Sequence, residues 1–344
     1  MNVSFDTFIC ANSKDGFFTY QDDLMKMDNI TVIKGGPGTG KSTLMRKIAT
    51  FYEQQGLSVE KIHCSSDPNS LDGVYIIDKS SVYFDGTSPH AQELPLPGAG
   101  CRLLDLGMFW NTENLKQQKE KISQFNNEIK AHYSKAYNLL KAAGQCADVC
   151  DYITEPFCDN KKLEKYIKNL SQKLFPPLKH QGIEHRRFSY SISHLGSFCF
   201  DDTYSKICEK VYKIVDNNSY ILPIILEKIK NNANKAGYET TAFFSPLDPK
   251  KCEFLYIKEL KLGIGNTSNA NPYLKINTLR FLNCEALKEY RNRIRFYKKM
   301  QKELINDAVT EFKKIKKLHD DLESIYIKEM DFGGVNKLIK KELV

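Results

Sequence analysis

The stretch Ile30-Thr31-Val32-Ile33-Lys34-Gly35-Gly36-Pro37-Gly38-Thr39-Gly40-Lys41-Ser42-Thr43 decides the fold that we expect for this chain of 344 residues. It contains the phosphate-binding pattern G-x-x-x-x-G-K-[ST], with its fixed positions at Gly35, Gly40, Lys41 and Ser42. A short β-branched run precedes the pattern and a helical period follows it, as a true match requires. The stretch therefore predicts a P-loop between a strand and a helix.

The chemistry of a P-loop explains these residue types. Small residues let the backbone N–H groups of residues 36–41 point into one concavity that can hold phosphate oxygens. The positive end of the following helix and the ammonium of Lys41 add charge at the same place. Ser42 is expected to hold Mg²⁺ with the nucleotide. The predicted nucleotide-binding residues are Gly35, Gly36, Pro37, Gly38, Thr39, Gly40, Lys41, Ser42 and Thr43.

Composition sets the class of protein. The net charge is +8, from 50 basic and 42 acidic residues, and the basic surplus gathers in helical stretches such as residues 288–317. Such a surplus is typical of a solvated helix face, and a nucleic-acid surface is the less favoured alternative. The first residues lack the basic and apolar regions of a signal peptide, and the apolar runs are too short for a membrane span, so we expect neither feature. Its ten cysteines form no Cys-x-x-Cys pair, so we expect free thiols, no protein metal site and a cytoplasmic location.

Two apolar runs end in an acid that could support Mg²⁺ at the Ser42 side, residues 74–78 with Asp78 and residues 82–85 with Asp85. We prefer Asp85, because a loop of the kind found at the active end of a strand follows it, whereas Asp78 precedes a hairpin-like turn. Lys41 and Asp85 are therefore the predicted catalytic residues, and Ser42 and Asp85 the predicted metal ligands. No second carboxylate follows Asp85, so the adjacent catalytic glutamate of many ATPase motors is missing.

Two further side chains have a functional and a simpler structural interpretation. His90 is either a base in the phosphate site or a structural loop histidine. Arg102 is predicted to lie in a loop, either as an arginine finger for the γ-phosphate or as a surface arginine. The polar loop at residues 65–73 either borders the nucleotide or a second substrate, or only connects two strands.

The remaining periodicity predicts an α/β chain with helical extensions. A strand at residues 57–64 after the P-loop helix makes a β-loop-α-β unit, which builds a mostly parallel sheet flanked by helices. Residues 113–143 have the spacing of one long amphipathic helix, and residues 161–174 continue in helix. The sequence Phe175-Pro176-Pro177-Leu178 then marks a domain boundary.

Beyond this boundary the order of the chain repeats in an altered form. Residues 214–229 align without a gap with residues 33–48, which puts Asp216, Ile221, Leu222 and Pro223 where the first half has Gly35, Gly40, Lys41 and Ser42. Asn266 takes the place of Asp85. We expect that the second half cannot bind a triphosphate in this way. The predicted parts are a P-loop nucleotide-binding domain (1–110), a helical extension and linker (111–178), a degenerate P-loop-like domain (179–282) and a second helical extension (283–344).

Several runs together resemble one protein family. They are residues 34–45 around the P-loop, His63-Cys64-Ser65-Ser66-Asp67-Pro68-Asn69-Ser70-Leu71-Asp72-Gly73-Val74, Asp85-Gly86-Thr87-Ser88-Pro89-His90, and Leu106-Gly107-Met108-Phe109-Trp110. Over nearly its whole length the chain resembles bacterial tandem P-loop proteins, usually described as ATPases or as nucleotide-kinase-like. The resemblance implies a P-loop fold with a helical extension in each half, and ATP binding, but no particular substrate. The second half of this family often has its own P-loop, and this sequence departs from the family there.

The sequence thus predicts a Mg-dependent ATP-binding protein, a slow P-loop ATPase with one site in its first half and with ATP and Mg²⁺ as its ligands. One alternative is a kinase that uses ATP as phosphoryl donor, with a nucleotide or small-molecule acceptor near residues 65–72 and His90. The other is a non-catalytic switch in which nucleotide binding changes how the halves or helices meet a partner. The preference for ATP over GTP rests on no base-recognition motif, and the oligomeric state stays open.

Overall fold

One sheet of twelve strands runs through the computed structural model, which describes residues 3–87, 97–200, 202–217, 219–267 and 272–343. Six strands come from the first half, in the order β8 (Cys101–Asp105), β4 (Asn29–Lys34), β7 (Ser81–Asp85), β6 (Leu71–Ile76), β5 (Val59–His63) and β1 (Phe5–Phe8). The second half continues with β9 (Glu184–Phe188), β13 (Thr240–Phe244), β14 (Cys252–Ile257), β15 (Leu262–Gly265), β12 (Lys210–Val215) and β16 (Leu274–Asn277). Phe8 of β1 meets Phe188 of β9 at a single bridge between the halves.

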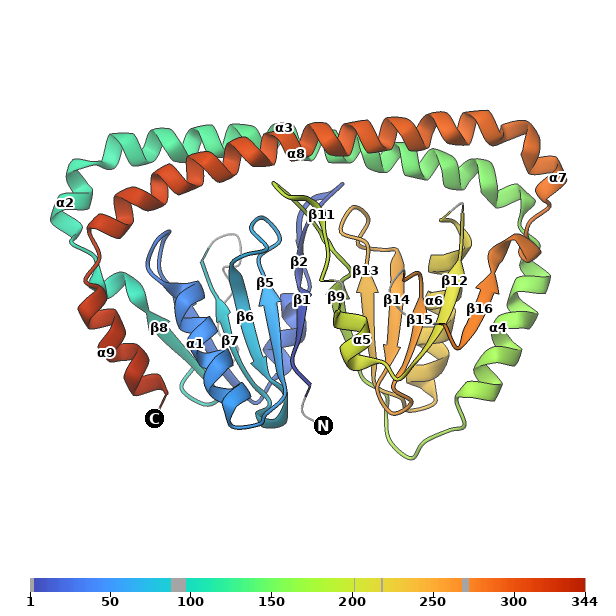
Figure 1. Ribbon diagram of the computed structural model, residues 1–344, viewed down its shortest axis with the longest axis horizontal. Coiled ribbons are helices and arrows are strands. Elements are labelled where there is room, and N and C mark those ends of the chain that lie inside the picture. The colour runs from blue at the N-terminus through green and yellow to red at the C-terminus, as the bar shows by residue number, and fades with distance from the viewer. Residues whose placement is uncertain (1–2, 88–96, 201, 218, 268–271, 344) are drawn as a thin grey trace.

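Within each half, five strands are parallel and one is reversed. β6 pairs antiparallel with both β5 and β7, and β14 does the same between β13 and β15. The other pairings within the halves are parallel. Helices flank this mostly parallel sheet, with α1 (Lys41–Gln54) against β6 and α6 (Ile221–Lys235) against β14 (Figure 1). The expected class, α/β with a mostly parallel sheet, is confirmed.

The second half repeats the elements of the first, and the offset is constant over the strands around the glycine-rich loop. Adding 181 to the residue numbers of β4, β5 and β6 gives those of β12, β13 and β14. Hairpins also correspond, β2 (Cys10–Ser13) with β3 (Gly16–Thr19) and β10 (Ser191–Ser193) with β11 (Gly196–Phe198). The structure therefore has the gap-free register that the sequence predicts between residues 33–48 and 214–229.

Burial explains why the central elements form. β4 buries Ile30, Val32 and Ile33, as expected of a strand with neighbours on both sides and a helix on its face. α1 buries Leu44 and Ile48 on one stripe, and the left-handed Gly56 (φ +75°) follows its end. The first extended segment of the chain is divided at Ile9, because β1 joins the large sheet and β2 turns away into its hairpin.

The longest helices form an antiparallel pair across both halves, which we call the helical bar (Figure 1). It consists of α3 (Lys119–Thr154) and α8 (Arg291–Lys328), preceded by α2 (Thr112–Gln117) and α7 (Cys284–Leu287). The prediction of one helix over residues 113–143 was right at its start, where α2 begins at Thr112, but wrong about its continuity and its end. The helix is interrupted at Gln118 and continues to Thr154, with Gly144 packed against the side chain of Lys14 rather than ending it.

The last helix of each half packs on the other half. α4 (Asn160–Leu174) lies against α6, whereas Val335 and Ile339 of α9 (Phe332–Glu342) enter the core that contains Leu44 and Ile48. Equivalent backbone hydrogen bonds hold the two segments that lead into these helices. The Asp331 N–H donates to the Phe109 carbonyl at 2.9 Å, and the Asp159 N–H donates to the Phe281 carbonyl at 2.8 Å. Each half therefore completes its core with a helix from the other.

Short helices complete the described chain: η1 (Gln21–Lys26), η2 (Ile77–Lys79), η3 (Leu106–Phe109), η4 (Glu155–Phe157), α5 (Thr203–Ile207), η5 (Thr278–Phe281) and η6 (Lys288–Tyr290). None of the described helices has the length and apolar character that a membrane span needs.

Candidate phosphate-binding site

A glycine-rich loop, residues 35–40, joins β4 to α1 at the carboxyl end of β4. Two parallel neighbours, β7 and β8, end at the same edge of the sheet, below the helical bar (Figure 1). Gly35, Gly38 and Gly40 have φ values of +149°, +69° and +89°, which side chains rarely adopt. A Cβ atom at Gly35 would lie 2.6 Å from Thr39 Oγ1. The loop conformation therefore depends on glycine at these positions.

Lys41 is folded onto the loop that precedes it. Its Nζ atom donates to the carbonyls of Gly35 at 2.7 Å and Gly36 at 2.8 Å, and it lies 3.6 Å from Asp85 Oδ2. The side chains of Lys41 and Asp85 are only 13% and 14% exposed. Two residues 44 positions apart in the sequence thus form one largely buried ion pair at the mouth of the loop.

Asp85 reaches this place because β7 lies beside β4, with Asp85 opposite Ile33. Its Oδ1 accepts the Thr87 N–H at 2.8 Å, and the Thr87 hydroxyl donates to the Gly35 carbonyl at 2.7 Å. Asp78, the alternative acid, lies in η2 before β7 begins, where its Oδ2 accepts the Ser58 N–H at 2.5 Å. The structure thus brings Asp85 to Lys41 and leaves Asp78 at the other end of the strand.

Ser42 and the loop at residues 65–73 lie side by side. The Ser42 hydroxyl accepts the Leu71 N–H at 3.0 Å, so the polar loop borders the start of α1. Farther along this loop, Tyr133 of the helical bar donates to Ser66 Oγ at 3.1 Å, and Asp67 lies 3.6 Å from Lys316. The loop is thus packed between the start of α1 and the helical bar.

The first turn of α1 has no side-chain cap among the described residues, since Gly40 occupies the N-cap position. In the part of the chain that the structure describes, no recorded hydrogen bond joins a side-chain carboxylate to the N–H groups at this helix start. The equivalent turn of α6 is different. There Asp216 Oδ2 accepts the N–H groups of Ile221 at 2.8 Å and Leu222 at 2.7 Å, and Oδ1 lies 3.1 Å from Thr278 Oγ1. In the second half a carboxylate of the chain itself occupies the positive end of the helix.

The outer side of the glycine-rich loop rests on residues that the sequence analysis did not identify. A Cβ atom at Gly36 would lie 3.0 Å from the ring of Trp110, and one at Gly38 would lie 2.7 Å from Ile327 Cγ1 and 3.1 Å from the Glu323 carbonyl. Ile327 and Glu323 belong to α8, which comes from the second half. Trp110 lies in a run that the sequence singled out, but no pattern in α8 indicates that it covers this loop.

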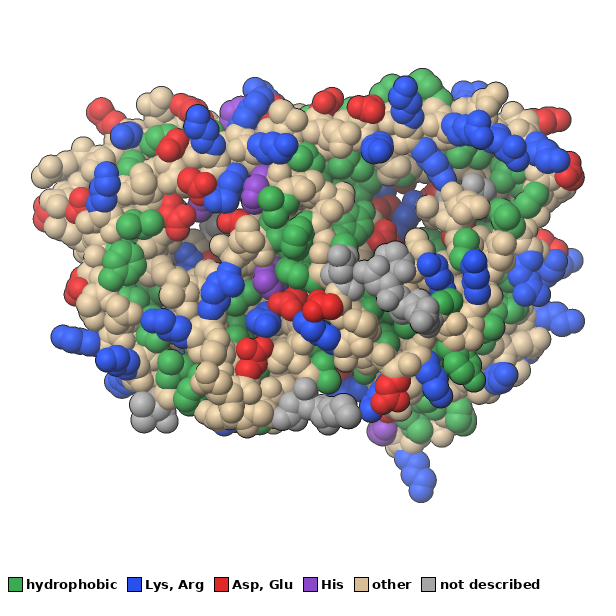
Figure 2. Space-filling view, viewed as in Figure 1, with side chains coloured by type: hydrophobic (Ala, Val, Ile, Leu, Met, Phe, Trp, Pro, Cys, Tyr) green, Lys and Arg blue, Asp and Glu red, His purple; other side chains and the backbone are tan. Residues whose placement is uncertain are grey.

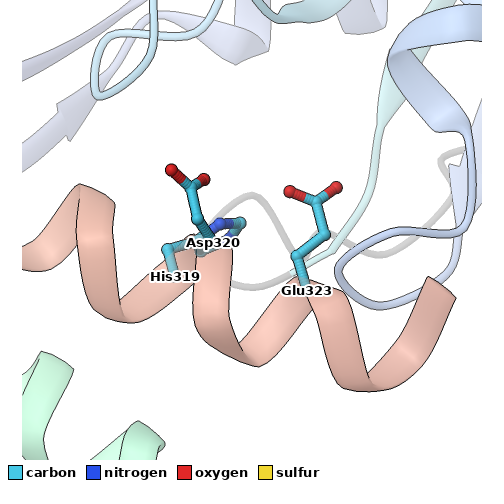
Figure 3. Close-up of side chains that lie close together, drawn as sticks. All are labelled: His319, Asp320 and Glu323. Carbon is cyan, nitrogen blue, oxygen red and sulfur yellow. The ribbon is translucent and has the colours of Figure 1, made fainter. Parts of the chain in front are cut away.

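The same part of α8 carries three potential metal ligands. Ligand atoms of His319, Asp320 and Glu323 lie within 4.8 Å of one another, and Figure 3 shows both carboxylates on the same side of the helix. Asp320 is also paired with Lys316 at 2.5 Å. His319 and Asp320 are exposed and Glu323 is half-buried, so this is a polar helix face near the glycine-rich loop.

The other predicted residues have different outcomes. Arg102 does not lie in a loop: it is part of β8, opposite Thr31, where its guanidinium is paired with Glu342 of α9. Because β8 continues for three residues beyond it towards the loop edge, Arg102 is a link to α9 rather than an arginine finger. His90 lies outside the described residues. None of the ten cysteines, all of which lie in the described part of the chain, forms a disulfide bond, in line with the expected thiols.

Comparisons with protein-family models, with curated proteins and with solved structures found no match for this chain.

Proposed function

We propose that this chain has a P-loop fold in its first half, binds a Mg-nucleotide there, with ATP as the expected nucleotide, and hydrolyses it slowly. The observation that carries the proposal is the placement of Lys41 beside Asp85 at the uncapped start of α1. A cation, free backbone N–H groups and a helix N-terminus that converge on one loop are the features that bind phosphate groups.

The residues present also fit a magnesium ion. Ser42 and Asp85 offer a hydroxyl and a carboxylate oxygen, and Mg²⁺ prefers oxygen ligands combined with substrate phosphates. When bound, the ion would neutralise charge on the phosphates. Lys41 and the loop N–H groups would stabilise the charge that develops on the phosphate oxygens during transfer. Gly86 follows Asp85, so the sequence-adjacent catalytic glutamate of many ATPase motors is missing, which is why we propose slow hydrolysis.

A second candidate is a switch without turnover, and the contact between the glycine-rich loop and α8 favours it. Gly36 and Gly38 have their outer sides against Trp110 and Ile327, with little free space. A shift of the loop upon nucleotide binding would therefore press on α8 and, through it, on the helical bar. Nucleotide binding without ADP release would support the switch over the ATPase.

Paired acid substitutions test the site directly. Isothermal titration calorimetry would measure ATP affinity with Mg²⁺ and with EDTA for wild type, Asp85→Asn and Asp78→Asn. We expect wild type to bind Mg-ATP more tightly than ATP alone. In Asp85→Asn this gain in affinity from Mg²⁺ should be at least tenfold smaller, a difference of about 1.4 kcal/mol. Asp78→Asn should behave as wild type, because Asp78 lies at the far end of β7. Equal magnesium dependence in all three proteins would refute the assigned role of Asp85.

A further inference from the structure

The beginning of α8 carries an unusual concentration of positive charge. Between residues 288 and 302 the chain has seven basic residues and one acidic residue. The equivalent segment of the first half, residues 116–130, has four basic and two acidic residues. Because the two segments occupy corresponding places in the repeat, the fold alone does not demand the extra charge in the second.

Four of these residues form one stripe. Arg291, Arg295 and Lys299 follow each other at intervals of four, and Lys302 falls on the same side, so they share one face of the helix. All four are exposed, whereas Ile294, on the side that faces the core, is buried. The stripe is about 16 Å long at 1.5 Å per residue. Figure 2 shows Lys and Arg side chains along the helical bar above the second half.

The stripe is not neutralised by the chain itself. Within the described ranges, no ion pair involves Arg291, Arg295, Lys299 or Lys302, although other lysines of α8, such as Lys314 and Lys316, are paired with acids. Unpaired basic residues at this density form a surface that attracts a polyanion.

Apolar side chains border the stripe on its outer side. Phe296 is 56% exposed and Met300 is 40% exposed, one helical turn apart. Basic residues that track a phosphate backbone, next to an exposed aromatic ring on which a base can stack, are the combination found in single-strand binding surfaces. Duplex nucleic acid would use the charges but leave the ring without a partner, since its bases are already stacked.

We propose that this surface, Arg291, Arg295, Lys299 and Lys302 with Phe296 and Met300, binds single-stranded nucleic acid. It lies far from the glycine-rich loop, because about 32 Å of helix separates Lys302 from Glu323. The proposal therefore does not depend on nucleotide binding in the first half.

Fluorescence anisotropy with a labelled 20-nucleotide oligouridylate and oligothymidylate tests the proposal. Four phosphate contacts predict that the affinity of wild type falls about 50-fold between 50 and 200 mM salt. The variant R291Q/R295Q/K299Q/K302Q should bind at least tenfold more weakly at 50 mM salt, with a flatter salt dependence. The matched control K116Q/K119Q/K121Q/K130Q removes four exposed charges from the equivalent segment and should stay within about twofold of wild type. Circular dichroism melting verifies that each variant is folded.

Two further measurements distinguish single-stranded nucleic acid from other polyanions. Phe296→Ala should weaken single-strand binding about fivefold or more, through loss of base stacking. A 20-base-pair duplex should bind more weakly than the single strands. Binding of the duplex at equal strength, equal binding by wild type and the quadruple variant, or stripe-dependent binding only to vesicles with 30% phosphatidylserine would each overturn the proposal.

Discussion

Asp216 shows how one residue can change an anion site. In the first half Gly40 leaves the start of α1 open, whereas in the second half the Asp216 carboxylate accepts two N–H groups at the start of α6. A carboxylate at a helix N-terminus satisfies the same groups and the same helix dipole that a phosphate would. The second half therefore retains the geometry of an anion site, but its own Asp216 carboxylate occupies that site.

Removal of this carboxylate should destabilise the protein without creating a nucleotide site. Asp216→Ala leaves two N–H groups uncapped, and we expect a loss of about 1–2 kcal/mol in the free energy of unfolding, measured in urea. Asp202→Ala is the control, since within the described ranges the Asp202 carboxylate is paired with Lys206 alone, at an exposed position, and its loss should cost less than about 0.5 kcal/mol. A neutral effect of Asp216→Ala would mean that the cap is not needed for stability.

At this scale the sequence predicted what depends on local pattern. The motif indicates Lys41 and Ser42, and of the two candidate acids the structure places Asp85, not Asp78, beside Lys41. The metal-binding role of Asp85 stays a prediction. Thr87 was quoted but given no role, although its hydroxyl holds the Gly35 carbonyl. Contacts of this kind depend on which strands become neighbours, and a spacing rule contains no such information.

At the scale of elements, the contact between the glycine-rich loop and α8 links a site to a helix from the other half. Glycine is needed at Gly38 for two separate reasons, a left-handed φ of +69° and the lack of space beside Ile327. Gly16 has a comparable φ of +97°, but no atom lies within 4 Å of an added Cβ. Substitutions at these two glycines therefore distinguish the cost of backbone strain from the cost of overpacking.

Gly16→Ala should cost about 1 kcal/mol of unfolding free energy from strain alone. Gly38→Ala should cost about 3 kcal/mol, because overpacking against α8 adds to the strain. The double variant Gly38→Ala/Ile327→Ala makes room for the new methyl group, so the two losses should be less than additive in urea unfolding. Strict additivity would show that the loop and α8 do not pack against each other in solution.

Elements with strong apolar periodicity were predicted correctly. Elements whose structure depends on pairing or packing with distant parts of the chain were not. The strand and helix around the loop and the repeat at residues 214–229 follow from apolar spacing. Arg102 was assigned to a loop because glycines precede it, yet pairing with β4 makes it part of a strand. The helix predicted to end at residue 143 continues through Gly144, which gives Lys14 room to pack against α3.

At the scale of the whole molecule, a buried ion pair joins the halves where the backbone pairing is sparse. Arg187 of β9 donates to Glu60 of β5, with 2.8 Å between Arg187 Nη2 and Glu60 Oε2, and both side chains are at most 4% exposed. Burial alone would raise the pKa of Glu60, but the Arg187 charge and hydrogen bonds hold it below its ordinary value of 4.5. The folded state therefore favours ionised Glu60.

Loss of this ion pair should lower the free energy of unfolding, and the size of that loss should depend on pH. Arg187→Met leaves a buried carboxylate without its cation, which we expect to cost about 3–5 kcal/mol of unfolding free energy at pH 7. Because the folded pKa is lowered, the stabilisation by the pair is present above pH 4.5 and is lost as the pH falls towards the folded value. The deficit of Arg187→Met should therefore shrink in acid, and Glu60→Gln should restore much of it at pH 7. A deficit independent of pH and of Glu60 would contradict this account.

The exchange of terminal helices could not be foreseen from the sequence. The amphipathic patterns of α4 and α9 predict helices with one buried face, and either half offers an apolar surface for them. The length of the helical bar determines which half each terminal helix packs on, because α3 and α8 each begin over one half and end over the other (Figure 1). Long-range geometry of this kind appears only when both halves are folded together.

The central claim, a Mg-nucleotide site in the first half, is tested most directly by thermal unfolding with and without Mg-ATP. Lys41→Ala removes the cation of the loop, and Lys47→Ala is the control, an exposed lysine on the same helix. ATP at a hundred times its dissociation constant should stabilise wild type and Lys47→Ala by about 2.7 kcal/mol, a rise of several degrees in Tm. Lys41→Ala should show little or no rise. An unchanged Tm of the folded wild type at saturating Mg-ATP, Mg-GTP and Mg-ADP would contradict the claim.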